Sequence, residues 1–283
     1  MCFSVVVIYL LKGRYIMKIV QKFSKVHTTA SPNRKIEYIV IHYTAGTTSK
    51  SGSAVNNAIF FSTTDREVSS DYIVDDEYCC QYNGDIENRY TWHCGGSRYK
   101  TKGGTYYGKC TNRNSIGIEV CSSNSTGRMQ NANDVSYSFT TAVIRNTEEL
   151  VLALMKKYNI PVENVIRHYD VNGKPCPGVI GYNTESGSNN LWNSFKDRLS
   201  LKAGTTESTD NKLYYVQVGA FKSKSNAYNY LNKEVKPIYS DAFVKEEGGY
   251  YYVQVGAFKS EANANNCLKA TRVQFPKAFI KRF

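Results

Sequence analysis

Two histidines and one cysteine stand where they could bind a metal ion. His168 lies in the segment RHYDVNGKPCPG, and Cys176 follows it by eight positions, between two prolines that restrict its backbone. Imidazole and thiolate both suit Zn²⁺, and a catalytic zinc needs three protein ligands and an open position. His42, at the end of an apolar run, is the candidate for the third ligand. Each histidine alone is explained as well by a core or loop position; the three residues together predict a zinc site.

Glu119 is the candidate for proton transfer. In the predicted strand 115–121, the branched apolar residues fall on one face and Glu119 falls on the other, between Gly117 and Cys121. A lone carboxylate in an apolar strand is costly unless it is paired or has a chemical role. A structural ion pair is one explanation. Beside zinc, it would take a proton from the attacking water and pass it to the leaving amine.

These residues need a framework of alternating elements. The apolar patterns predict strands at 36–41, 71–75, 78–82, 115–121 and 164–168, and helices at 53–61, 140–158 and 191–199. Alternating strands and helices predict an α/β fold with a mixed central sheet flanked by helices. The predicted domain covers residues 17–199.

A polar linker at 200–211 precedes an internal repeat. The ten residues YYVQVGAFKS occur at 214–223 and again at 251–260, and a helical pattern follows each copy. Two strand-helix-strand units predict a small ferredoxin-like βαββαβ domain over residues 212–283. Two copies are too few for a solenoid.

Composition narrows the partners without selecting one. The chain has a formal charge of +12 and 23 tyrosines among 283 residues, which suits nucleic acid, teichoic acid or peptidoglycan, although solubility alone also explains a net charge. The eight cysteines show no framework spacing, so most are expected to be reduced and buried. Adjacent Cys79 and Cys80 would point to opposite faces of a strand and not pair with each other.

The first residues are apolar and lack the pattern of a signal peptide. Residues 1–11 have no preceding positive charge, and Lys12 and Arg14 come after the run. The run is also too short to span a bilayer. We expect residues 1–16 to be an extension without a role in the fold; a short membrane-touching segment is the alternative.

Five segments, in order, resemble the type-2 N-acetylmuramoyl-L-alanine amidases, a family that includes phage lytic amidases and animal peptidoglycan recognition proteins. They are IVIHYTAG (39–46), SDYIVD (70–75), TWHCG (91–95), NSIGIEV (114–120) and the segment 168–178. The resemblance covers about residues 36–182. It implies one zinc held by His42, His168 and Cys176.

The same resemblance implies roles for further residues. Glu119 would be catalytic, and Tyr72 would lie near the attacking water. From its position alone, two residues before the ligand cysteine, Lys174 would sit beside the zinc, where a cation can stabilise the oxyanion. His93 and Trp92 would line the substrate groove.

Residues 212–283 resemble the SPOR family, which binds glycan strands stripped of stem peptides. The two YYVQVGAF segments carry the resemblance, and alternation puts Tyr215 and Tyr252 on a face that can bind sugar. An RNA-binding sheet has the same topology, but neither repeat has the basic and aromatic motif that such a sheet requires.

The sequence therefore predicts zinc-dependent hydrolysis of the amide between N-acetylmuramic acid and L-alanine, in a phage endolysin. Such a protein stays in the host cytoplasm until lysis and then acts on the cell wall. Its partner would be peptidoglycan, both glycan strands and stem peptide, with no nucleic acid and no stable membrane insertion. The alternatives are a bacterial autolysin, secreted and wall-associated, a non-catalytic recognition protein, and a nucleic-acid-binding protein suggested by charge alone.

Overall fold

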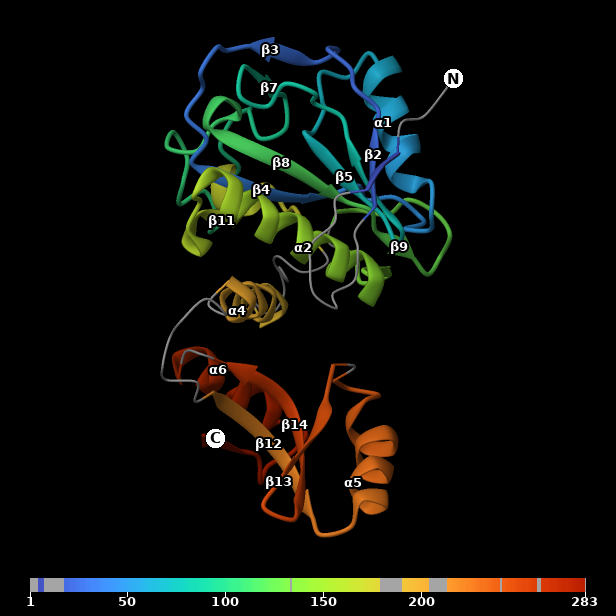
Figure 1. Cartoon of the computed structure of the whole chain (residues 1–283), viewed down its shortest axis with the longest axis vertical. Helices are drawn as coiled ribbons and strands as arrows, with labels where there is room; N and C mark the ends of the chain where they lie inside the picture. The colour runs from blue at the N-terminus through green and yellow to red at the C-terminus, as the bar shows by residue number, and fades with distance from the viewer. Residues whose placement is uncertain are drawn as a thin grey trace. The chain divides into compact units, whose positions relative to one another are not determined.

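The chain folds into two compact units, residues 1–189 and 190–283 (Figure 1). The structure is a computed structural model that describes residues 5–7, 18–132, 134–178, 190–203, 213–239, 241–258 and 261–282. Helix α4 (Asn190–Ala203) belongs to the second unit, whereas the sequence analysis assigned residues 190–199 to the first domain and residues 200–203 to the linker. The two units are described separately.

The first unit is built on a seven-stranded mixed sheet. In sheet order the strands are β1 (Val5–Val7), β2 (Lys18–Gln21), β6 (Tyr78–Gln81), β5 (Tyr72–Val74), β8 (Ser115–Val120), β4 (Tyr38–Tyr43) and β11 (Val165–Arg167). The pairs β1–β2 and β5–β6 are antiparallel, and the other pairs are parallel. The predicted mixed α/β sheet is confirmed.

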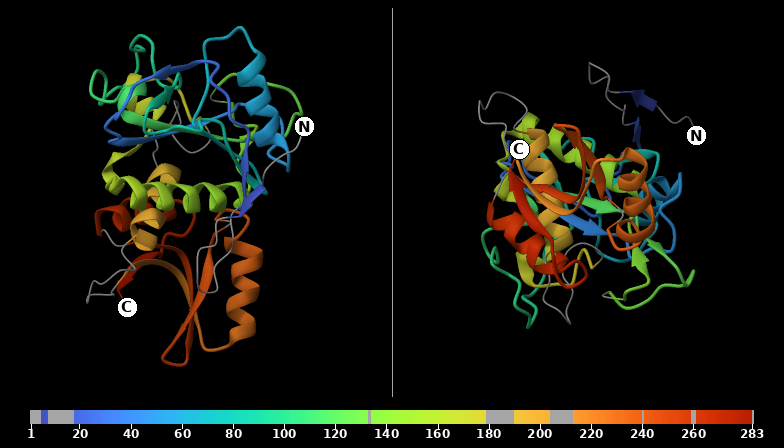
Figure 2. Two further views of the ribbon diagram at one scale, coloured as in Figure 1. Left: turned by 45° about the horizontal axis from the view of Figure 1, so that its top comes forward. Right: turned by 90° about the horizontal axis from the view of Figure 1, so that it is seen from below.

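Two helices cover this sheet, and several shorter elements complete the unit. Helix α1 (Ser53–Thr63) packs against β5 and β6, and α2 (Thr141–Tyr158) packs against β5, β6 and β8 (Figures 1 and 2). The remaining elements are β3 (Thr28–Ala30), β7 (Arg89–Thr91), β9 (Ser123–Asn124), β10 (Tyr137–Ser138), α3 (His168–Asn172) and the 3₁₀ turns Asn112–Asn114 and Val162–Asn164.

Helix α2 shows why the predicted helix forms where it does. The Thr140 side chain accepts a hydrogen bond from the backbone N–H of Val143 at 3.1 Å, which caps the first turn. Asn159 ends the helix in the left-handed conformation, with φ of 53°. Between them, Leu150, Val151 and other apolar residues are buried, so this helix holds one face of the sheet in place.

The second unit has the predicted ferredoxin-like arrangement. Its antiparallel sheet has the order β13 (Phe243–Glu247), β14 (Tyr250–Phe258), β12 (Tyr214–Phe221), β15 (Phe279–Arg282). Helix α5 (Lys224–Tyr230), which continues into a π-helical segment at Leu231–Val235, and α6 (Glu261–Thr271) pack against it. Helix α4 contacts α6 and β14.

Two local differences from the sequence analysis matter. Strand β11 ends at Arg167, so His168 begins helix α3 and does not end a strand. Residues 5–7 pair with β2 as an edge strand, and the other residues of the predicted extension 1–16 lie outside the described part. Within the described residues, every helix falls short of the length and apolar character that crossing a membrane requires.

Candidate active site

Strand pairing brings the two predicted histidine ligands together. Arg167 of β11 pairs with Ile41 of β4 in parallel register, so the next residue of each chain segment, His168 and His42, emerges at the same sheet edge. Their ring centroids are 4.7 Å apart. The loop after α3 brings Cys176 back to the start of that helix, where the backbone N–H of Tyr169 donates to the Cys176 carbonyl at 2.9 Å.

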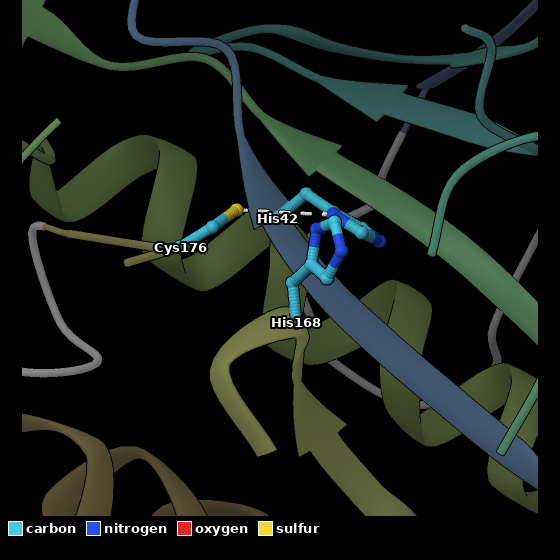
Figure 3. A group of neighbouring side chains, drawn as sticks. All are labelled: His42, His168 and Cys176. Atoms are coloured by element: carbon cyan, nitrogen blue, oxygen red, sulfur yellow. Dashed lines mark hydrogen bonds between the residues drawn. The ribbon is translucent and has the colours of Figure 1, made fainter. Parts of the chain in front are cut away.

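The three side chains form one buried cluster. One potential ligand atom from each of His42, His168 and Cys176 lies within 4.8 Å of the others. Figure 3 shows the Cys176 thiol pointing toward His42, with Sγ 3.8 Å from Nδ1, while the His168 ring reaches toward the same point. Both ring nitrogens of His168 are buried without a hydrogen-bond partner. Orphaned nitrogens in a buried site are accounted for by a metal ligand role.

The electrostatics of the cluster suit a cation. Burial lowers the pKa of His42 and of His168 well below the usual range, so both rings are neutral and can donate a lone pair. Burial, with the nearby Glu119 carboxylate, raises the pKa of the Cys176 thiol to about 12. The thiolate form of Cys176 therefore needs a positive charge beside it, which a bound metal ion supplies.

Glu119 lies beside this cluster. It pairs with His42 in parallel register between β8 and β4, so both side chains point to the same face of the sheet. The residue is partly exposed, but its Oε2 atom is buried and has no hydrogen-bond partner. Burial raises the pKa of Glu119 to about 7, against the opposing charge of Lys174. A carboxyl group with such a pKa can both take and release a proton near neutral pH.

Lys174 is exposed at the edge of the same site. Its backbone N–H donates to Asn172 Oδ1 at 3.1 Å, which fixes the turn before Cys176. The lysine charge lowers the pKa values of Glu119 and His168, so it acts on both the carboxylate and the ligand cluster. The structure thus brings together the predicted ligands, Glu119 and Lys174.

Tyr72 is placed elsewhere. The next residue of β5, Ile73, packs with α1 and pairs with Glu119, so Tyr72 points to the opposite face of the sheet. Burial raises the pKa of its hydroxyl, as do the neighbouring Cys79 and Tyr158, the last residue of α2. The expected place of Tyr72 beside the attacking water is corrected, because the sheet itself separates its side chain from the ligand cluster.

Trp92 and His93, both expected in a substrate groove, differ in their surroundings. The Trp92 indole donates to Thr29 Oγ1 at 2.8 Å, and its ring lies 5.6 Å from that of His27. His93 is 9% exposed and bonds to His42 at 3.0 Å and to Ser115 at 3.1 Å. Both ring nitrogens of His93 are thus used inside the protein, and it joins the cluster through His42.

Ser115 and Gly117 escaped the sequence analysis as site residues. Both lie on the Glu119 face of β8, at the alternate positions before it. A Cβ at Gly117 would lie 2.6 Å from Cγ of His93, so the glycine makes room for that ring. The period-two pattern of the strand placed these residues on one face, but it gave no sign that a histidine from another segment covers them.

In the second unit, tyrosines and basic residues share the sheet face opposite the helices. Lys245 Nζ lies 5.5 Å from the Tyr215 ring centroid, and Lys281 Nζ lies 3.8 Å from that of Tyr252. Gln217 and the side chain it pairs with across the strands, Gln254, are buried, yet amide atoms of both lack partners. This face therefore offers aromatic rings and cations together, while the two amide groups lie buried beneath them.

The cysteines behave as the sequence analysis expected. Within the described part of the chain the cysteines are free, and all but Cys267 are buried. Cys80 packs toward α1, whereas Cys79 adjoins Tyr72, so the two point to opposite faces.

His42, His168 and Cys176, which could hold one metal ion, lie beside the Glu119 carboxyl group on a mixed α/β sheet, an arrangement that suits a hydrolase. Comparison with protein families gives the family. Residues 32–179 match N-acetylmuramoyl-L-alanine amidase (Amidase_2), more than half of the chain, and the protein belongs to this family. Residues 181–246 and 210–282 match the SPOR domain.

Curated amidases from Bacillus subtilis (strain 168) are similar to this chain over more than half of its length. The N-acetylmuramoyl-L-alanine amidase CwlA is 30% identical over 210 residues, which cover 68% of this chain and 65% of CwlA. The amidase CwlH is 31% identical over 163 residues, which cover 58% of this chain and 52% of CwlH. The matches thus span between half and two thirds of these relatives. The solved structure of PlyL is similar at 27% identity, with a TM-score of 0.44, over 63% of this chain and 94% of PlyL.

Proposed function

We propose that this protein is a zinc-dependent N-acetylmuramoyl-L-alanine amidase that hydrolyses the amide between the lactyl group of N-acetylmuramic acid and L-alanine in peptidoglycan. The observation that carries the proposal is the buried cluster of His42, His168 and Cys176 beside Glu119, in a chain of the amidase family. The related proteins CwlA and CwlH carry the same activity in their names.

One zinc ion would be held by His42, His168 and Cys176. Two neutral imidazoles and one thiolate are a donor set that Zn²⁺ prefers, and three protein ligands leave one position open. The partnerless nitrogens of His168 support this assignment. When bound, zinc supplies Lewis acidity for the attack of water on an amide carbonyl.

Glu119 would move the proton. In hydrolysis, a water oxygen forms a bond to the carbonyl carbon, the C–N bond breaks, and the water proton ends on the departing amine of L-alanine. The buried Oε2 of Glu119 is free to accept the proton, and a pKa near 7 lets the same group release it. One carboxyl group can therefore serve first as base and then as acid.

Lys174 would balance charge at the carbonyl oxygen. Negative charge develops on that oxygen when water adds, and a fixed cation nearby stabilises it. The charge of Lys174 lowers the pKa values of both Glu119 and His168, which supports this role for its ammonium group.

The second unit would hold the enzyme on the cell wall. The Tyr215 and Tyr252 rings offer apolar surfaces to sugar faces, and Lys245 and Lys281 lie beside these rings. Its match to the SPOR domain supports glycan as the ligand. We place the domains at residues 17–189 and 190–283, with α4 as part of the wall-binding unit.

The biological setting belongs to the same proposal. We infer a phage endolysin, which would reach the cell wall from the host cytoplasm at lysis. A wall-associated bacterial autolysin would have the same chemistry and the same ligands. Timing of expression during infection, compared with vegetative growth, separates these two origins.

Digestion of purified walls tests the activity. We expect release of N-terminal L-alanine without new reducing sugars, loss of activity with a chelator, and recovery with Zn²⁺. Replacing Cys176 with Ala should remove activity and bound zinc together. New reducing ends would identify a glycosidase, and full activity without metal would exclude the zinc mechanism. Tight wall binding without any cleavage would identify a recognition protein instead.

A further inference from the structure

A directed chain of hydrogen bonds runs from the ligand His42 to the protein backbone. His42 Nε2 lies 3.0 Å from His93 Nδ1, and His93 Nε2 lies 3.1 Å from Ser115 Oγ. Ser115 Oγ in turn donates to the backbone carbonyl of Thr111 at 2.5 Å. All three side chains are buried, so water does not compete for these bonds.

The last bond of the chain fixes every proton before it. A carbonyl oxygen only accepts, so the Ser115 hydroxyl proton points to Thr111 and its oxygen accepts from His93 Nε2–H. Burial opposes a second proton on the His93 ring, although the neighbouring Cys94 raises the pKa of the ring overall. With its single proton on Nε2, the ring has its lone pair on Nδ1, which accepts from His42 Nε2–H. The remaining lone pair of His42 is therefore on Nδ1, the atom that faces Cys176 Sγ at 3.8 Å. The Cys94 thiol is a longer contact of Ser115, at 3.7 Å.

The surrounding backbone is shaped to hold the His93 ring. Asn112 Oδ1 accepts from the backbone N–H groups of His93 and Cys94, at 3.1 and 2.7 Å. Across the ring, a Cβ at Gly117 would come within 2.8 Å of His93 Nδ1. Strand β8 thus supplies the hydroxyl partner at 115 and the space at 117, while Glu119 lies further along the same face.

We propose that His93 and Ser115 are positioning residues for the metal ligand His42. They hold its imidazole in the Nε2–H tautomer and orient the Nδ1 lone pair toward the metal position. The inference rests on the proposed metal site and replaces a direct substrate contact by His93. Partners that fix a ligand histidine in this way typically change metal affinity by about 10–100-fold.

Zinc affinity of the full-length protein, measured by competition with a chromophoric chelator, tests the proposal. His93→Phe keeps a ring and removes the acceptor, and should weaken zinc binding by about 10–100-fold. His93→Asn puts an amide oxygen near the Nδ1 position, and should recover most of that loss. Ser115→Ala should weaken zinc binding less than His93→Phe does, and should add no loss in the His93→Asn background, because the shorter side chain no longer reaches residue 115.

Ser122→Ala is the matched control. Its hydroxyl is also buried and donates to a backbone carbonyl, that of Gly46 at 3.2 Å, but it has no place in the chain of bonds to His42. We expect unchanged zinc affinity. An equal loss in Ser122→Ala and Ser115→Ala would show that any buried hydroxyl near β8 matters, and would overturn the proposal.

Nitrogen-15 chemical shifts of the wild-type imidazoles keep the test independent of how the variants fold. The expected pattern is a proton on Nε2 of both His42 and His93; a proton on Nδ1 of His93 overturns the proposal. If the wild-type protein binds zinc and folded His93→Phe binds it with the same affinity, the positioning role is rejected but the proposed function is not. A wild-type protein that binds no zinc would instead reject the proposed function.

Discussion

The metal-free protein should lose stability between about pH 5 and pH 8 because of one buried carboxyl group. Burial raises the pKa of Glu119 from 4.5 to about 7. Between these two pKa values the unfolded chain has released the Glu119 proton and the folded chain still keeps it. The stability of the folded state is therefore highest below pH 4.5, and it is lost as the pH rises through the Glu119 pKa of the folded chain, about 7. At 1.36 kcal/mol per pKa unit, the loss reaches at most about 3 kcal/mol by pH 8.

Glu119→Gln removes this titration and keeps the shape of the side chain. In the presence of a chelator, the variant should become more stable than the wild type as pH rises, with a gap that grows by about 2–3 kcal/mol between pH 5 and pH 8. The pH effects of the buried histidines are shared by both proteins, so they largely cancel in the comparison. Zinc should reverse the trend in the wild type, because a cation favours the ionised carboxylate.

Urea unfolding can isolate the first unit. The chain has two tryptophans, Trp92 in the first unit and Trp192 in the second, so a Trp192→Phe background leaves fluorescence that reports on the first unit. Glu67→Gln, at an exposed carboxylate, is the control and should show no growing gap. A Glu119→Gln gap that stays constant from pH 5 to pH 8 would refute the reasoning, since it would mean that the folded carboxyl group titrates normally.

Three further predictions follow from the geometry. Tyr72→Phe should change kcat in wall digestion assays by less than about threefold, because the Tyr72 hydroxyl lies on the far face of the sheet. Glu119→Gln, by contrast, should lower kcat by about 10²–10⁴-fold with zinc retained. A larger effect of Tyr72→Phe would return Tyr72 to the site. A chain ending at Asn189 should cleave small soluble muropeptides normally but insoluble walls slowly, because tethering raises local substrate concentration; equal losses on both substrates would contradict this. The fragment 190–283 should resist urea better than 213–283, since α4 contacts α6 and β14, and equal unfolding midpoints would remove α4 from the wall-binding unit.

The sequence alone determined the chemistry of the candidate site and the repeat. The identities and spacing of His168 and Cys176 give the donor types, and alternation in the strand 115–121 isolates Glu119 on one face. Likewise, two copies of one ten-residue segment specify a symmetric βαββαβ unit. Such features are local, because they depend on residue type and on periods of a few residues.

Only the tertiary structure decided which face of each strand meets the site. Tyr72 and Ile73 are neighbours in β5, and alternation alone cannot tell which of them shares a face with Glu119; the pairing of β5 with β8 decides it. His93 reaches His42 because the segment after β7 folds over Gly117, and α4 joins the second unit through contacts with α6 and β14. Strand order and packing join residues far apart in the chain, and the free energy of those contacts is not encoded in any local period.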